Sequence, residues 1–129
     1  MRIDRLDHLV LTVADLDVTI AFYADVLGME AVVFEDDQHA LHFGSSKINL
    51  HAAGHELEPK AVRPRPGSAD LCFTTTDPLE QVQAELEAHG VMIIEGPVAQ
   101  TGARAGLRSV YFRDPDGNLV EVANELRTS

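Results

Sequence analysis

Hydrophobic and polar residues alternate in the first part of the chain, from Leu6 to Val13, and this alternation predicts a β-strand. Its two faces carry different side chains: Leu9, Leu11 and Val13 on one, and His8, Val10 and Thr12 on the other. A histidine at such a position is commonly an ordinary structural residue, so the strand by itself assigns no role to His8.

A helix is expected directly after this strand, because Asp15 suits an N-cap and apolar residues then recur at helical spacing as far as Gly28. Three further strands are expected, over Met29 to Phe34, His39 to Phe43 and Lys47 to His51. The first half of the chain is therefore predicted to have the order βαβββ.

The next segment, from His51 to Ser68, is rich in proline and glycine and has no apolar period, which is typical of a linker or an ordered loop. It contains Lys60, Arg63 and Arg65, three of only ten Lys and Arg residues in the chain. These bases indicate either a solvated loop or a patch that meets an anionic substrate.

The pattern of the first half then returns at a constant offset of 62 residues, with Asp70 to Asp77 corresponding to His8 to Asp15. The offset holds without a gap through a second helix, in which Asp77 matches the cap Asp15 and Gly90 matches the stop Gly28. Strands are expected near Val91 to Glu95, Arg108 to Phe112 and Leu119 to Ala123, and residues 96–106 are expected to form a long loop.

This internal duplication predicts one α+β domain over residues 1–129, built from two tandem βαβββ modules. Module one spans about residues 4–53, a linker about 54–67 and module two about 68–125. One helix covers one face of each sheet, so we expect helices on the outer faces and curved mixed sheets around a cavity.

Several chemically active side chains fall by parity on the uncovered sheet faces: His8, Asn49, His51, Asp70 and Glu121. Imidazoles and carboxylates held on rigid strands around a cavity form a typical ligand set for a divalent metal. The residue types suit Zn, Ni, Mn, Fe or Co and do not choose among them.

Charge and cysteine content exclude several classes of partner. The ten Lys and Arg against 21 Asp and Glu give a net charge of -11, which argues against nucleic acid or an anionic membrane surface. The single cysteine, Cys72, excludes an intrachain disulfide and is expected to be a small core or cavity residue, not a nucleophile. With no apolar leader or membrane-length run, we expect a cytoplasmic protein.

Three segments carry a resemblance to a known family: residues 7–16, residues 22–29 and residues 112–122. They resemble the vicinal oxygen chelate superfamily of glyoxalase I, bleomycin resistance proteins and extradiol dioxygenases, over essentially the whole chain. Residues 47–51, 58–61 and 66–73 further resemble glyoxalase-domain-containing, lactoylglutathione lyase-like proteins.

The resemblance implies a metal site whose residues can be followed position by position. His8 matches the ligand on the first strand and Glu121 the ligand on the last. Asn49 stands where glyoxalase I has a carboxylate, and Asp70 stands where metal-dependent relatives generally have histidine. His51, two residues after Asn49 on the same face, and Asp70 are the candidates to complete the set.

The function implied is that of a divalent-metal-dependent lyase or isomerase acting on a small carbonyl compound or its thiol adduct. The metal would act as a Lewis acid on two vicinal oxygens, and Glu121 would double as the catalytic base. A thiol transferase, an extradiol dioxygenase and a non-catalytic small-molecule binding or resistance protein remain alternatives. The superfamily also suggests a homodimer.

Other polar residues have less specific interpretations. Arg108 is either a contact for an anionic substrate or an ordinary surface arginine, and Tyr111 falls on the opposite face of the same strand. His42 reaches the uncovered face by parity, whereas Phe22 and Tyr23 are expected in the core.

Overall fold

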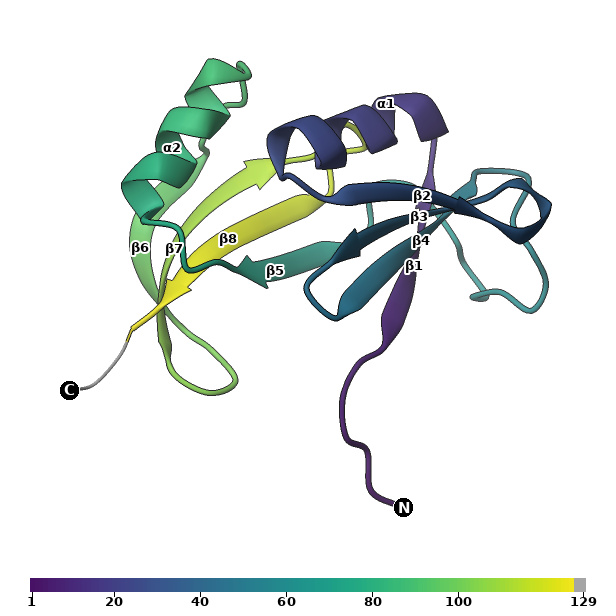
Figure 1. The fold of residues 1–129 in the computed structure, drawn as a ribbon, viewed down its shortest axis with the longest axis horizontal. Helices are drawn as coiled ribbons and strands as arrows, with labels where there is room; N and C mark the ends of the chain where they lie inside the picture. Colours follow the sequence, from purple (N-terminus) through teal and green to yellow (C-terminus); the bar gives the residue numbers. More distant parts are fainter. Residues whose placement is uncertain (127–129) are drawn as a thin grey trace. The chain divides into compact units, whose positions relative to one another are not determined.

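The alternating segment at the start of the chain forms strand β1 (His8–Val13) of a four-stranded sheet. The computed structural model describes residues 1–126, which divide into unit 1, Met1–Gly67, and unit 2, from Ser68 onward (Figure 1). The division falls at the end of the segment predicted to be a linker.

Unit 1 has the predicted order of a strand, a helical segment and three strands. The elements after β1 are α1 (Leu16–Ala21) with its π-helical continuation (Phe22–Val26), β2 (Glu30–Phe34), a short 3-10 turn (Glu35–Asp37), β3 (Gln38–Phe43) and β4 (Ser46–Ala52). The sheet order is β1-β4-β3-β2, with β1 parallel to β4 and the other pairs antiparallel.

Local sequence explains the ends of the first helix. The Asp15 carboxylate accepts a hydrogen bond of 3.1 Å from the Val18 amide, which confirms the predicted N-cap. Gly28 has φ +70°, a left-handed conformation that favours glycine, and it ends the helical segment.

Unit 2 repeats this architecture with β5 (Asp70–Thr74), α2 (Leu79–Ala88), β6 (Glu95–Thr101), β7 (Gly106–Arg113) and β8 (Leu119–Glu125). Its sheet order is β5-β8-β7-β6, the counterpart of the order in unit 1, and β5 is parallel to β8. The predicted α+β class with two βαβββ modules and mixed four-stranded sheets is confirmed. The cavity around which the sheets were expected to curve stays a prediction.

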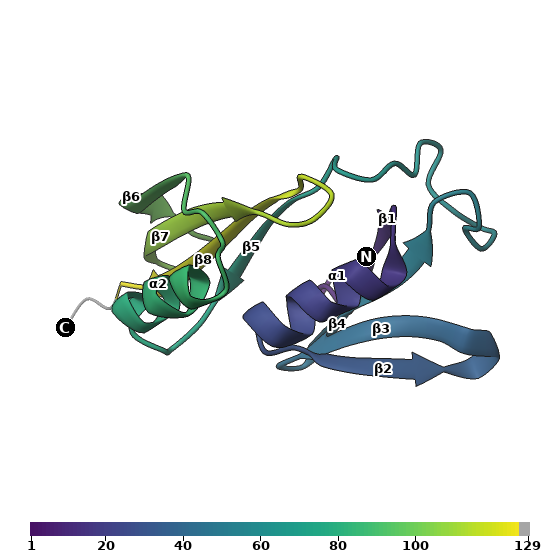
Figure 2. The same cartoon turned by 90° about the horizontal axis from the view of Figure 1, so that it is seen from above.

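Each unit has its own core between one helix and one face of its sheet (Figure 2). Most of the large apolar side chains buried on the strands lie on the face opposite His8 in unit 1 and opposite Glu121 in unit 2: Leu11, Val13, Leu41, Ile48 and Leu50, and Val110, Phe112, Val120 and Val122. Tyr23 is fully buried and Phe22 half-buried, as expected of helix residues facing a core.

Two local predictions are wrong. The second strand of module two was expected at Val91 to Glu95, but β6 begins at Glu95 and occupies part of the expected loop. The pairing of β6 with β7 shifts register between Glu95 and Val98, and this irregularity obscures the strand pattern in the sequence. A Cβ at Gly96 would collide with the Ser109 carbonyl, so the bulge requires glycine.

The second wrong prediction concerns the start of α2. Asp77 was expected to cap this helix, but the cap position is Pro78, which makes no side-chain cap hydrogen bond. The Asn124 side chain instead accepts a hydrogen bond of 3.1 Å from the Leu79 amide and donates to the carbonyls of Thr75 and Asp77. A residue 45 positions further along the chain therefore satisfies the helix terminus.

Over residues 1–126, no helix has both the length and the apolar character that a membrane span requires.

Candidate functional site

The face of the unit 1 sheet that α1 does not cover carries the residues predicted by parity. β1 and β4 pair in parallel, and the pairs on this face are His8 with Lys47, Val10 with Asn49 and Thr12 with His51. His42 on β3 pairs with Lys47 and Ala40 pairs with Asn49, so His42 also belongs to this face. We refer to it as the open face of unit 1.

His8 is oriented by its neighbour in the sequence. Its Nδ1 lies 2.9 Å from Asp7 Oδ1, and since a carboxylate can only accept a hydrogen bond, Nδ1 carries the proton. This tautomer leaves a lone pair on Nε2. The hydrogen bond from His8 is the largest cause that lowers the pKa of Asp7, and Arg5, 3.5 Å away, lowers it further. Metal-binding histidines usually donate a hydrogen bond from their other ring nitrogen to a carboxylate, a backbone carbonyl or water, and this bond fixes the orientation of the ring.

The register separates the candidate ligands on this face by different amounts. His8 pairs with Lys47, and His51 lies four residues after Lys47 on β4, which corresponds to about 13 Å along the strand. Asn49 lies only two residues after Lys47, or about 7 Å along the strand. Asn49 is therefore nearer to His8 than His51 is.

The structure adds to the prediction at two residues of the open face: Lys47 was not predicted as functional, and Asn49 was predicted only as a member of the polar set on this face. Lys47 stands between His8 and His42, and its half-buried side chain places Nζ 4.7 Å from the centre of the Phe34 ring. Asn49 has a side-chain oxygen, Oδ1, that is buried and has no hydrogen-bond partner within residues 1–126. The signal for Lys47 was in the sequence, because it is the only Lys or Arg between Leu6 and Pro59.

In unit 2, Glu121 lies at the centre of the corresponding face. It pairs with Cys72 on β5 and with Tyr111 on β7. Its Oε2 accepts a hydrogen bond of 2.5 Å from the Ser109 hydroxyl, which is completely buried. The Glu121 carboxylate is thus half-buried and held by a neighbouring strand.

The charge of Glu121 affects the acids around it. Partial burial, and then the Glu121 carboxylate, raise the pKa of the Cys72 thiol to about 11. Desolvation followed by the same carboxylate raises the pKa of the Tyr111 phenol to about 12. Cys72 is exposed on the sheet face, so of the two expectations, a core or a cavity residue, the core residue is wrong and the cavity residue stays a prediction. Its raised pKa keeps the thiol protonated at neutral pH.

Asp70 lies on the same face of unit 2 as Glu121, paired with Leu119. It is one strand away from Glu121 and two residues along the sheet, which is the relation that His8 has to Asn49 in unit 1. The strand pairings therefore confirm the sequence offset that aligns Asp70 with His8, and they make Asn49 the counterpart of Glu121. The structure does not gather three or more His, Cys, Asp or Glu side chains into one metal-binding group within residues 1–126.

Arg108 is not a substrate contact on the open side of its sheet. Its Nη1 donates a hydrogen bond of 3.1 Å to Glu80 Oε1 on α2, which places it on the helix-covered face. Of the two interpretations given to it, the ordinary surface arginine is correct, because an even-numbered position on β7 shares a face with Val110 and Phe112. The loop bases Lys60, Arg63 and Arg65 are exposed.

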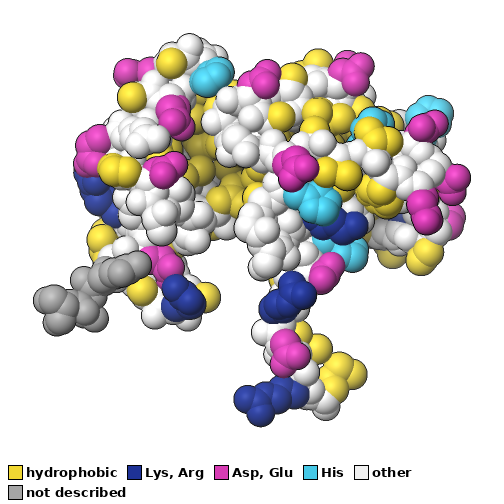
Figure 3. All heavy atoms as spheres, viewed as in Figure 1, with side chains coloured by type: hydrophobic (Ala, Val, Ile, Leu, Met, Phe, Trp, Pro, Cys, Tyr) yellow, Lys and Arg dark blue, Asp and Glu magenta, His cyan; other side chains and the backbone are white. Residues whose placement is uncertain are grey.

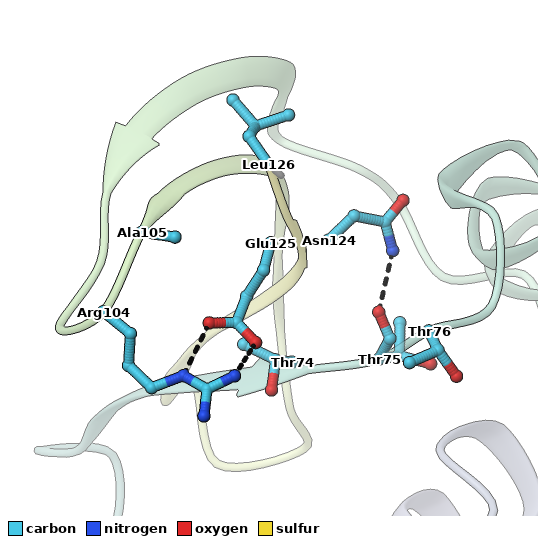
Figure 4. Close-up of a pocket in the computed structure, with 8 residues that line it drawn as sticks. All are labelled: Thr74, Thr75, Thr76, Arg104, Ala105, Asn124, Glu125 and Leu126. Carbon is cyan, nitrogen blue, oxygen red and sulfur yellow. Dashed lines mark hydrogen bonds and ion pairs between the residues drawn. The ribbon is translucent and has the colours of Figure 1, made fainter. Parts of the chain in front are cut away.

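One hollow of about 900 Å³ lies at the end of the unit 2 sheet, lined in part by Thr74, Thr76 and Asn124 (Figure 4). The Arg104 guanidinium binds the Glu125 carboxylate there with two hydrogen bonds, of 3.0 and 2.9 Å. None of the residues predicted for the site lines this hollow.

Comparison with known proteins identifies the family. The model of the Glyoxalase/Bleomycin resistance protein/Dioxygenase superfamily matches residues 5–122. The chain is 56% identical over 123 residues to Virulence protein STM3117 of Salmonella typhimurium, covering 95% of this chain and 85% of that protein. The crystal structure of that protein superimposes with a TM-score of 0.96, covering 98% of this chain and all of the other. Glyoxalase domain-containing protein RDO1 of Mycosarcoma maydis is 50% identical over 96% of this chain and 70% of its own length.

More distant relatives carry names that state an activity. Lactoylglutathione lyase of Schizosaccharomyces pombe is 26% identical over 96% of this chain and 48% of its own length. Metallothiol transferase FosB of Shouchella clausii is 25% identical over 93% of this chain and 80% of its own length. The fosfomycin resistance protein FosX of Listeria monocytogenes, solved with Mn(II), shares the fold with a TM-score of 0.67 at 21% identity, over 97% and 93% of the two chains. From the match over residues 5–122 and the relatives of 50% identity or more, the chain belongs to the glyoxalase, bleomycin resistance protein and dioxygenase superfamily.

Proposed function

We propose that this protein is a divalent-metal-dependent enzyme with lyase or isomerase chemistry, acting on a small carbonyl compound or its thiol adduct. The observation that carries the proposal is the hydrogen bond of His8 Nδ1 to Asp7, because it leaves Nε2 with the lone pair that a metal needs. Superfamily membership and the named lyase and transferase relatives support the same class of chemistry.

The donor chemistry of the proposed residues fits a divalent cation such as Mn, Fe, Co, Ni or Zn. His8 offers an imidazole nitrogen and Glu121 a carboxylate oxygen, and Asp70 and His51 are the proposed residues to complete the set. A cation bound there would polarise two neighbouring oxygens of a substrate and lower the cost of negative charge on them.

Glu121 is the proposed base. Ser109 donates to Oε2 and so fixes the orientation of the carboxylate, which is the requirement for moving a proton at a defined position. The raised pKa values of Cys72 and Tyr111 keep both neighbours protonated at neutral pH, so they remain donors toward this carboxylate and do not compete with it as bases.

A non-catalytic binding protein is the second candidate. It is favoured by the two positions at which the ligand set departs from that of glyoxalase I, Asn49 and Asp70. Loss of ligands with retention of the fold would leave a protein that binds small molecules without turning them over.

The two candidates are separated by loading the protein with each of the five metals and following the methylglyoxal–glutathione adduct, together with free aldehydes and ketones, by ultraviolet absorbance. An enzyme gives metal-dependent turnover that His8→Ala and Glu121→Gln both abolish. The variant His55→Ala, at an exposed loop position, keeps the turnover rate of the wild type. Metal binding without turnover of any compound would favour the binding protein. If the absorbance stays constant only with the methylglyoxal–glutathione adduct, glyoxalase I activity is excluded, and other lyase or isomerase activities are not.

A further inference from the structure

The open face of unit 1 contains one permanent positive charge, that of Lys47. In a chain of net charge -11, no other Lys or Arg occurs between Leu6 and Pro59. Most lysines of soluble proteins extend into solvent, but this side chain is half-buried on a sheet face. Its position therefore requires a physical explanation.

The neighbours of Lys47 form a row across the sheet. Lys47 pairs with His8 on one side and with His42 on the other, and Glu30 pairs with His42 at the far edge. Figure 3 shows Lys or Arg, His and acidic side chains close together on one part of the surface of unit 1. The acid next to His8 is Asp7, which is already occupied by His8 and Arg5.

The ammonium group of Lys47 contacts an aromatic ring, and its charge also acts on the Asp7 carboxylate, whose pKa it helps to lower. Nζ lies over the Phe34 ring at 4.7 Å, a cation–π contact, and within residues 1–126 Lys47 forms no ion pair. A half-buried ammonium that contacts an aromatic ring retains most of its capacity to bind an anion, because three donor hydrogens remain.

Asn49 supplies a second unsatisfied group on the same face. It follows Lys47 by two residues, so the two Cα atoms are about 7 Å apart. Its Oδ1 is buried and has no donor within residues 1–126, and such an acceptor normally finds a partner. A bound molecule with a hydroxyl group would provide one.

We infer that the open face of unit 1 binds a small carboxylate that carries a hydroxyl group close to its carboxyl group. Lys47 binds the carboxylate and Asn49 Oδ1 accepts a hydrogen bond from the hydroxyl. One ammonium matches the single charge of a carboxylate, whereas phosphate sites generally use arginine or several backbone amides. This inference rests on the proposed function in one respect, which is that the carboxylate belongs to the substrate.

Three probes of nearly the same size test the two contacts separately. Lactate has both the carboxylate and the hydroxyl, propionate has only the carboxylate, and lactamide has only the hydroxyl. Each is titrated into metal-free protein and followed by the amide resonances of unit 1. We expect lactate to bind about tenfold more tightly than lactamide and several-fold more tightly than propionate.

Two variants assign these preferences to residues. Lys47→Met is expected to abolish the preference for lactate over lactamide, and Lys60→Met, an exposed lysine of the loop, is the matched control. Asn49→Leu is expected to abolish the preference for lactate over propionate without changing Mn(II) affinity. If Lys47→Met does not fold by circular dichroism, Lys47→Gln replaces it.

The outcomes separate this inference from the proposed function. Equal binding of lactate and lactamide by the wild type, or an unchanged preference in Lys47→Met, would overturn it even if the protein binds metal. A loss of Mn(II) affinity in Asn49→Leu would make Asn49 a metal ligand and overturn its assignment to the hydroxyl. The probe preferences without any metal binding would support this inference and contradict the proposed function.

Discussion

Asp7 and His8 form the contact that orients the candidate ligand on the first strand. Strand parity in the sequence places His8 on the uncovered face, but the role of Asp7 depends on the conformations of two adjacent side chains and cannot be predicted from spacing. Lys47 and Ser109 were missed for a related reason. Their neighbours lie on other strands, and the register of a sheet decides which residues meet.

Asp7→Asn is expected to weaken Mn(II) binding by about tenfold or more, because an amide holds the His8 imidazole less firmly and makes it a poorer donor. Titration calorimetry measures the affinity. Asp4→Asn, an exposed carboxylate in the same N-terminal segment, is the control. Equal affinity in the Asp7 variant and the wild type would remove Asp7 from the site.

The Cys72 thiol is expected to react slowly with a disulfide reagent in metal-free protein, although it is exposed. With its pKa raised to about 11, only roughly a thousandth of the thiol is ionised at pH 8, and the rate rises with pH up to the pKa. Glu121→Gln removes the neighbouring charge and should increase the rate at pH 8. A wild-type rate equal to that of a free cysteine would contradict this environment.

The elements of the fold follow the sequence closely where the signals are local. The Asp15 cap, the left-handed glycines at the helix ends and the alternation of the inner strands are all local signals, and each is confirmed. The start of β6 and the cap of α2 were predicted wrongly because both depend on distant residues, β7 for the bulge and Asn124 for the cap.

Asn124→Ala is expected to lower the free energy of unfolding by about 2 kcal/mol, since it removes the donor to two carbonyls and the acceptor for the Leu79 amide. Denaturant unfolding followed by circular dichroism gives this value. Asp77→Ala, at the cap position that the sequence favoured, should change it by less than about 0.5 kcal/mol. A larger loss of unfolding free energy in Asp77→Ala than in Asn124→Ala would identify Asp77 as the cap.

At the scale of the whole molecule, the duplication was the most informative feature of the sequence. It predicted two units of the same order, and the equivalence of Asn49 with Glu121 appears again in the strand pairings. On the face shown in Figure 3, Asp and Glu side chains lie on both units, in keeping with the net charge of -11. The reaction could not be predicted to the same degree, because it depends on which side chains meet at one ion.

The homodimer suggested by the family resemblance is testable in solution. We expect light scattering after size-exclusion chromatography to give twice the mass of 14.1 kDa for one chain, at all concentrations above the micromolar range. A mass of one chain at every concentration would contradict the dimer.

The central claim is that His8 and Glu121 hold one divalent metal ion. Mn(II) binding, followed by electron paramagnetic resonance of the free ion, tests it most directly. We predict one ion per chain, with an affinity that His8→Ala and Glu121→Gln each reduce by about tenfold or more and that His55→Ala leaves unchanged. Absence of binding, or wild-type affinity in either of the first two variants, would contradict the claim.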